Sequence, residues 1–357
     1  MTESIDLYCH WLTPEFFRRV QAASSGRMHM LTRAGAMPVM MDLDARFRVM
    51  DLFPGYRQVP SIASPPVEAV GNPALAVELA RIANDEQAAI VARHPERFPG
   101  FVAVLPMSDP EAAQREASRA ILELGALGVQ IFSNIAGQPL DRPEFLDVIR
   151  HVARLGRPIW LHPTRGIDHA DYHDESHSKF DIWWAFGWPY ETSAAMTRLV
   201  FAGLMEESVV PNIITHHGGG LVPMVEGRLN AGLSQLGTRC PPGLQHTVET
   251  CITRPPIESF KSFFADTATF GSRSTIQCAL DFFGGDRLVF ASDMPFDPER
   301  GPGHIRSTLS ALAEMDLDSG ERQQILSGNA RRLCGLAKFP TPVVKPEAPQ
   351  PAPVTRA

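Results

Sequence analysis

Residues 287–293, RLVFASD, form a short apolar run that ends in an aspartate. Other apolar runs carry a residue suited to catalysis or metal binding at their last or next-to-last position: residues 5–11 (IDLYCHW), residues 158–162 (PIWLH) and residues 212–217 (NIITHH). Such short runs, bounded by Gly, Pro and polar residues, are typical of buried strands in a parallel sheet. We therefore expect strands here, with a chemically active residue at or near the carboxyl end of each.

Further runs at residues 57–63, 101–107, 128–132 and 262–267 bring the predicted strands to eight. The weakest of them is 57–63, because Pro60 cannot donate a hydrogen bond to a neighbouring strand. Helical patterns lie between the strands at 72–93, 109–124, 142–155, 191–206, 221–235, 273–283 and 303–314.

Strands that alternate with helices pair in parallel through right-handed crossovers. Eight such units close a (β/α)8 barrel, so we predict a distorted TIM barrel of the α/β class. An open doubly wound sheet is disfavoured, because no GxGxxG motif follows the first strand.

Two segments do not fit a minimal barrel. Residues 164–190 follow the fifth strand and contain three tryptophans, so we expect an ordered lid on the side of the active site. Residues 339–357 are Pro-rich and without periodicity, which predicts a disordered tail. Residues 1–338 are then a single barrel domain.

Composition excludes several classes of partner. The 357 residues carry 33 Lys+Arg against 40 Asp+Glu, a net charge of -7, which argues against nucleic acid. No apolar run reaches the roughly 18 residues that cross a membrane, and no signal peptide pattern is visible. Five scattered cysteines without a CxxC pair favour a reducing compartment, so we predict a cytoplasmic protein.

The carboxyl ends of parallel barrel strands meet at one rim, which brings imidazoles and a carboxylate together. These groups are ordinary ligands of Zn²⁺ and Mn²⁺, so we predict one divalent metal, zinc or alternatively manganese. Side chains two residues apart on a strand face the same way. Tyr8 should therefore face the barrel interior with His10, and His216 should point away from His217.

These segments resemble the amidohydrolase superfamily, in the branch of amino-carboxymuconate-semialdehyde decarboxylase and related aromatic-acid decarboxylases. The resemblance spans most of residues 5–335 and rests on IDLYCHW, LHP, THHGGGLVPMVEGR, FFADTATFG, VFASDMPFDPE and SGNARRL. It implies that His10, His162 and Asp293 hold the metal, commonly zinc.

Tyr8 stands where the family has the first His of an HxH pair. It either binds the metal as a phenolate or stands aside, leaving three protein ligands plus water, and we favour the second.

The resemblance also implies catalytic roles. His217 matches the His of the family's HGGG motif, a general acid–base that shares proton transfer with Asp293. We interpret His216 as structural.

Substrate contacts follow from the same resemblance. Arg228 matches an arginine that reaches a neighbouring subunit's site, which implies a homodimer. Arg46 matches a second carboxylate-binding arginine, with Arg48 as the alternative. A wall for a flat conjugated substrate is expected from aromatic side chains: Trp184, Trp188, Tyr190 and Phe296.

The implied function is a metal-dependent, non-oxidative decarboxylase of a small aromatic or muconate-type carboxylic acid, in the breakdown of aromatic compounds. The same groups also serve a metal-dependent hydrolase of a lactone or carbon–carbon bond, or a hydratase of a ring-cleavage product. A metal-free binding protein is a third alternative, because Tyr8 replaces an expected ligand.

Overall fold

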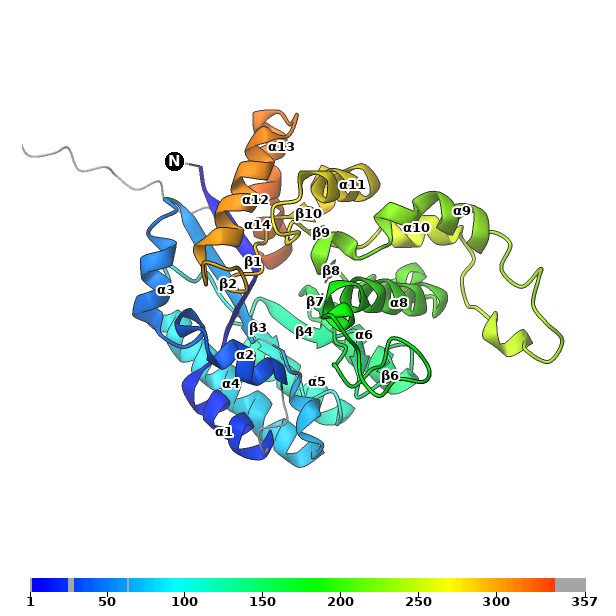
Figure 1. The fold of residues 1–357 in the computed structure, drawn as a ribbon, viewed down its shortest axis with the longest axis horizontal. Coiled ribbons are helices and arrows are strands. Elements are labelled where there is room, and N and C mark those ends of the chain that lie inside the picture. The colour runs from blue at the N-terminus through cyan, green and yellow to red at the C-terminus, as the bar shows by residue number, and fades with distance from the viewer. Residues whose placement is uncertain (1, 25–28, 63, 338–357) are drawn as a thin grey trace, which may run out of the picture.

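The computed structural model describes residues 2–24, 29–62 and 64–337, and Figure 1 shows their arrangement. Every predicted strand is present. Its ends either lie within one residue of the predicted ends or fall inside the predicted run. They are β1 (Ser4–Trp11), β2 (Tyr56–Ile62), β3 (Val102–Val104), β4 (Gly128–Phe132), β7 (Ile159–His162), β8 (Ile213–Thr215), β9 (Phe264–Asp266) and β10 (Leu288–Val289). The remaining strands, β5 (Asn134–Ile135) and β6 (Gln138–Pro139), form a small antiparallel hairpin after β4. Pro60 of β2 is accommodated opposite Cys9 in a parallel pair with β1.

The parallel strands form a closed ring. Hydrogen-bonded neighbours run β10-β9-β8-β7-β4-β3 on one side and β1-β2 on the other. The two parts meet at a seam, where the amide of Leu7 donates to the carbonyl of Phe290 at 3.0 Å and that of Asp293 donates to the carbonyl of Tyr8 at 2.8 Å. On the other side, the side chain of Gln130 in β4 donates to the carbonyl of Ile62 in β2 at 3.1 Å. The predicted barrel is confirmed.

Helices surround this ring, mostly one after each strand (Figure 1). The long α4 (Pro73–Arg93) begins where its sequence predicts, since the Asn72 side chain accepts from the amide of Leu75 and proline occupies the first turn. The others are α1 (Pro14–Ser24), α2 (His29–Gly35), α3 (Leu43–Met50), α5 (Pro110–Leu122), α6 (Pro143–Arg154), α7 (Ile182–Ala185), α8 (Gly187–Phe201), α9 (Glu226–Leu233), α10 (Pro256–Phe260), α11 (Arg273–Phe283), α12 (Pro302–Glu314), α13 (Ser319–Gln323) and α14 (Asn329–Cys334).

Two apolar clusters hold the layers together. The smaller cluster includes Tyr8, Trp160 and Phe264 from strands of the ring. The larger one joins strands to the helices; α6, for example, contributes Val148 and Val152, both fully buried. Each such aliphatic side chain contributes roughly 1.5–3 kcal/mol on burial. This packing fixes the strand ends on which the candidate site is built.

The lid at 164–190 is ordered by its own hydrogen bonds. Asp171 accepts from the hydroxyl of Ser178 and from the amide of Lys179, both at 2.8 Å, and Ser178 in turn accepts from the amide of Trp183 at 3.0 Å. The lid ends in α7 and the first turn of α8, which begins at Gly187, earlier than the sequence pattern suggests. The predicted tail, 339–357, lies outside the described residues.

Between β8 and β9 the chain runs outside the barrel. Figure 1 shows α9 and the segment after it extending to one side of the ring. None of the residues of α9 is buried. Among the described helices, none is long and apolar enough to span a membrane.

Candidate active site

Three buried histidines meet at the carboxyl ends of three strands. His10 lies near the end of β1, His162 ends β7, and His216 follows β8 directly. Their ring centroids lie 5.2 Å apart for His10 and His162, 5.1 Å for His162 and His216, and 5.9 Å for His10 and His216. One ligand nitrogen from each lies within 4.8 Å of the others, which is a spacing that can hold a metal ion.

Each imidazole is held through its Nδ1 atom. Nδ1 of His10 bonds to the hydroxyl of Ser61 at 3.0 Å, and Nδ1 of His162 to the carbonyl of Pro163 at 2.6 Å. Nδ1 of His216 bonds to a carboxylate oxygen of Asp266 at 2.5 Å. Partners of this kind fix the orientation and tautomer of metal-binding histidines and leave Nε2 free to bind the metal.

Asp293 completes the cluster from the segment after β10. Its Oδ1 lies 3.2 Å from Nε2 of His10 and 3.5 Å from Nε2 of His216. Its backbone is in the left-handed region, with φ at 60°, a conformation that costs free energy in a non-glycine residue. The strained turn aims the carboxylate at the histidines.

The protonation states suit metal binding. Burial would raise the pKa of Asp293, but the neighbouring His10 and His216 hold it well below its ordinary value. Burial lowers the pKa of His10, and it lowers the pKa of His162 well below the usual range. Neutral imidazoles beside an ionised carboxylate are the forms that bind a cation. Apart from the 3.2 Å contact with Asp293, the buried Nε2 of His10 has no hydrogen-bond partner among the described residues, so the donor set fits a divalent metal.

His216 lies in this cluster, so the prediction that it points away from the site is wrong. Alternation holds only within a strand, and β8 ends at Thr215. His217 then turns with φ at 56°, and its ring stacks on that of His216 at a centroid distance of 3.7 Å. Both imidazoles face the same region. Burial, together with the charge of His216, lowers the pKa of His217 to about 4 from 6.5.

The glycines after His217 bring the lid close. Gly218, Gly219 and Gly220 all have positive φ, which makes a tight turn. A Cβ at Gly220 would lie 2.5 Å from the carbonyl oxygen of Pro189 in α8. The turn therefore lets the lid helix pack directly beside the histidines.

Tyr8 does not offer its oxygen to the cluster. The phenol is fully buried, its hydroxyl donates to the carbonyl of Ile214 at 3.3 Å, and its ring stacks on His216 at 4.0 Å. Burial and the nearby carboxylates of Asp266 and Asp293 raise the pKa of Tyr8 well above its ordinary value, which opposes the phenolate form. This geometry agrees with the favoured alternative, in which Tyr8 stands aside.

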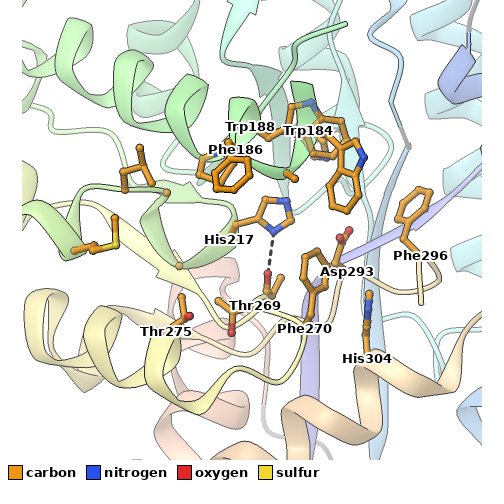
Figure 2. A pocket seen from close by; sticks show the side chains of 18 of the residues that line it. Trp184, Phe186, Trp188, His217, Thr269, Phe270, Thr275, Asp293, Phe296 and His304 are labelled. Atoms are coloured by element: carbon orange, nitrogen blue, oxygen red, sulfur yellow. Dashed lines mark hydrogen bonds between the residues drawn. The ribbon is translucent and has the colours of Figure 1, made fainter. Parts of the chain in front are cut away.

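A cavity of about 990 Å³ opens above the cluster (Figure 2). Among the predicted wall residues, Trp184, Trp188 and Phe296 line it. Trp188 lies 5.7 Å from the ring of His162, and Phe296 lies 5.7 Å from that of His10. Tyr190 is not among the residues that line this cavity and is 57% exposed, because its position in α8 faces outward.

The two alternative carboxylate-binding arginines, Arg46 and Arg48, both lie on α3 and do not line the cavity. Arg46 of α3 is buried, and its guanidinium donates to the carbonyl of Val39 at 3.1 Å, to the side chain of Gln58 at 2.6 Å and to the carbonyl of His10. Its hydrogen-bonding groups are therefore occupied in supporting the strand that presents His10, and the prediction that it binds substrate is wrong. Arg48 is exposed on the same helix, outside the lining of the cavity.

Arg228 lies exposed on α9 and does not line the cavity of its own chain. The residues just before α9, Pro223 and Met224, do line the cavity. The helix thus starts beside the cavity mouth, packs Leu229 and Leu233 partly against the core and leaves Arg228 exposed.

Asp266 was not anticipated by the sequence analysis. It is fully buried at the end of β9, and besides His216 its carboxylate accepts from the amides of Gly218 at 3.0 Å and Ala268 at 3.1 Å. The available signal was an aspartate at the end of a predicted strand, on the same rim as the other site residues.

Comparison with known proteins places this chain in a family. The profile of the amidohydrolase family matches residues 29–336. The chain belongs to the amidohydrolase family. It is 31% identical over 302 residues to the gamma-resorcylate decarboxylase of Polaromonas sp., covering 82% of this chain and 87% of that one. It is 27% identical to the 2-amino-3-carboxymuconate-6-semialdehyde decarboxylase of Dictyostelium discoideum, over 74% of this chain and 68% of that one.

Solved structures of decarboxylases are also similar to this chain over most of its length. A dihydroxybenzoic acid decarboxylase from Polaromonas sp., with bound manganese and the inhibitor 2-nitroresorcinol, is 25% identical. The match covers 95% of this chain and 98% of that one, with a TM-score of 0.77. A 5-carboxyvanillate decarboxylase from Sphingomonas paucimobilis shares the fold at a TM-score of 0.81, over 94% of this chain and 100% of that one, with 21% identity. The resemblance to the decarboxylase branch of the amidohydrolases, which are carboxy-lyases, is confirmed.

Proposed function

We propose that this amidohydrolase removes carbon dioxide from an aromatic or unsaturated carboxylic acid without net oxidation, in the breakdown of aromatic compounds. The observation that carries the proposal is the buried cluster of His10, His162, His216 and Asp293 at the floor of an aromatic-lined cavity. Its similarity to a gamma-resorcylate decarboxylase supports the same reaction class.

His10, His162 and Asp293 would hold the divalent metal. Bound there, the ion supplies Lewis acidity that polarises a substrate oxygen. A donor set of two imidazoles and one carboxylate suits zinc, which we propose as the occupant. Manganese is the alternative, since the similar Polaromonas structure binds it.

The reaction needs a proton at the carbon that bears the carboxylate. A new C–H bond forms at that carbon, the C–C bond to the carboxylate breaks, and its electron pair returns to the conjugated system as carbon dioxide leaves. Nε2 of His216 has no hydrogen-bond partner among the described residues and lies 3.5 Å from Asp293. We assign proton delivery to His216 together with Asp293.

His217, the proton carrier predicted from sequence, lines the cavity in Figure 2. Its Nδ1 bonds to the carbonyl of Ala268 at 2.9 Å. We propose that its flat ring serves as a wall against the substrate and orients His216 by stacking. Trp188, whose ring is nearly parallel to His217 with an interplanar angle of 14°, would form part of the same wall.

A homodimer would complete the site. Helix α9 has no fully buried residue, begins beside the cavity mouth and carries the exposed Arg228, and Met224 just before it is 69% exposed. We propose that two copies pair through this region, so that Arg228 meets a substrate carboxylate in the partner's cavity. Sedimentation of an active monomer would exclude this arrangement.

The test of function is a substrate panel with purified, metal-analysed protein. Carboxylated phenols and muconate semialdehydes are assayed for released carbon dioxide, and lactones for oxygen incorporated from labelled water. We expect carbon dioxide from at least one panel acid, and none after His10→Ala. Turnover of lactones without loss of carbon dioxide from any acid would instead make the protein a hydrolase. Protein that retains no metal after supply of Zn²⁺ or Mn²⁺ would contradict the proposed centre.

A further inference from the structure

The cavity wall carries one permanent positive charge among its described lining residues. This is Arg33 of α2, a helix that also contributes Met30 to the lining. Its guanidinium carbon lies 5.6 Å from the ring centroid of Trp184 in the lid. The remaining basic groups of the described lining are the histidines near the floor and His304.

Arg33 is free to take an anion. In the described part of the chain no carboxylate lies within ion-pair distance of it, although other arginines beside the lid are paired. Arg165, for example, lies 3.3 Å from Glu191. An exposed guanidinium at a cavity mouth, without a carboxylate of its own chain, keeps its donors for a ligand.

Trp184 supplies a second observation. Its Nε1 atom is buried and has no hydrogen-bond partner among the described residues. Trp188, from the same lid, instead donates its Nε1 to the carbonyl of Arg165 at 3.2 Å. A buried N–H without an acceptor costs free energy that a bound oxygen atom recovers. The guanidinium of Arg33 and the indole N–H of Trp184 are thus donors without an acceptor of their own in the described part of the chain, and the two oxygens of a carboxylate would supply acceptors.

The size of the cavity indicates what carries that carboxylate. At about 990 Å³ it lies at the upper end of the roughly 300–1,000 Å³ that is usual for small-molecule sites, and it is larger than a single-ring acid requires. One acid group of the substrate is needed at the metal cluster, where it is lost. Arg33 and Trp184 lie on the wall rather than in that cluster, so they are placed for a different acid group.

We propose that Arg33 and Trp184 bind a second carboxylate, and that the natural substrate is therefore an aromatic or conjugated diacid. This inference deepens the proposed function and rests on it for the chemistry. It also gives Arg33 the carboxylate contact that the sequence had suggested for Arg46, whose guanidinium is occupied elsewhere.

The test compares the binding of isophthalate, a diacid, with that of benzoate, a monoacid, to the metal-loaded protein by calorimetry. The unmodified protein should bind isophthalate about tenfold more tightly, which is the usual effect of a charge-assisted hydrogen bond. Arg33→Gln should abolish this preference and change the affinity for benzoate less than about twofold. Trp184→Phe, which keeps a smaller aromatic ring and removes the N–H, should reduce the preference partially.

Arg48→Gln is the matched control, because it removes an exposed arginine outside the cavity, and it should keep the preference intact. Equal binding of the two acids by the unmodified protein would overturn the inference. So would a preference that survives Arg33→Gln but disappears in Arg228→Gln, since the second carboxylate would then meet α9 of the partner.

The two proposals fail separately. Carbon dioxide release is measured on the same preparations with 5-carboxyvanillate, a diacid, and with 2,6-dihydroxybenzoate. Decarboxylation with no effect of Arg33→Gln on the choice between them would overturn the Arg33 inference alone. An Arg33-dependent preference for isophthalate without carbon dioxide release from any acid would support the inference while the proposed reaction fails.

Discussion

Replacement of Asp266 by Asn tests how His216 is prepared for proton transfer. The carboxylate of Asp266 accepts from Nδ1 of His216 at 2.5 Å, with both side chains fully buried. In Asp266→Asn the amide oxygen can still accept from the backbone amides of Gly218 and Ala268. The new NH2 group then faces Nδ1 of His216 and forces the proton of a neutral imidazole onto Nε2. The substitution also removes the negative charge that stabilises the protonated ring of His216.

The magnitude follows from two observations on His216. Burial alone would lower its pKa, but Asp266 and Asp293 outweigh burial and raise it to about 9 from 6.5. This corresponds to about 3 kcal/mol, shared between the two carboxylates. A hydrogen bond to a charged group is itself worth about 1.5–3 kcal/mol. We therefore expect kcat to fall by about 10- to 100-fold in Asp266→Asn.

The assay separates positioning from folding. Steady-state kinetics on the panel acid should show the loss in kcat, with KM and bound metal changed less than about threefold. Asp297→Asn is the matched control, because Asp297 is also buried and accepts from the backbone amides of Glu299 and Gly301 without touching a histidine. The reasoning is refuted if Asp266→Asn keeps the full kcat, or if Asp297→Asn lowers kcat equally.

Three further predictions concern residues around the site. Tyr8→Phe should leave the bound metal unchanged and lower stability by about 1 kcal/mol through loss of the bond to Ile214; a metal content that falls severalfold by elemental analysis would show that the phenol is a ligand. Arg46→Met should lower the free energy of unfolding in urea by about 3 kcal/mol, because buried carbonyls lose their donor, and it should leave KM nearly unchanged. A raised KM without loss of stability would instead show that Arg46 contacts the substrate. Burial raises the pKa of Glu68 to about 7 from 4.5, so the folded protein holds a proton that the unfolded chain releases, and this contribution to stability is lost as pH rises from about 4.5 to 7. Glu68→Gln should therefore gain up to about 3 kcal/mol relative to the unmodified protein over that range, and a difference that is constant with pH would contradict the assignment.

The barrel and three of its rim residues follow from sequence, because strand ends are local features. His10, His162 and Asp293 are each placed by a short apolar run that the structure keeps as a strand or as the segment joined to one. The wrong predictions concern features that local sequence patterns do not determine. The orientation of His216 depends on a turn beyond the last residue of β8, and alternation along the strand no longer applies there.

Arg46 shows a different limit. A helix pattern marks an arginine as a polar position, and it does not reveal that the guanidinium reaches a backbone carbonyl from another element. Asp266 was accessible by the same reasoning that found Asp293, since it lies one residue before the end of a predicted strand. Arg33 carried no such signal, because its role depends on how α2 and the lid meet across the cavity.

The seam of the barrel also determines when the proposed metal site can form during synthesis, because the site takes residues from both sides of the seam. His10 lies in β1 and Asp293 follows β10, the last strand of the ring, so the proposed ligand set is incomplete in a nascent chain until β10 is made. The ion can therefore be captured tightly only after the ring has closed. Held by His10 and Asp293 as we propose, the ion would link the two sides of the seam at the point where they hydrogen-bond, and it would stabilise the closed ring by its binding free energy. We therefore expect metal supply to act on the lifetime of the newly made protein as well as on its chemistry.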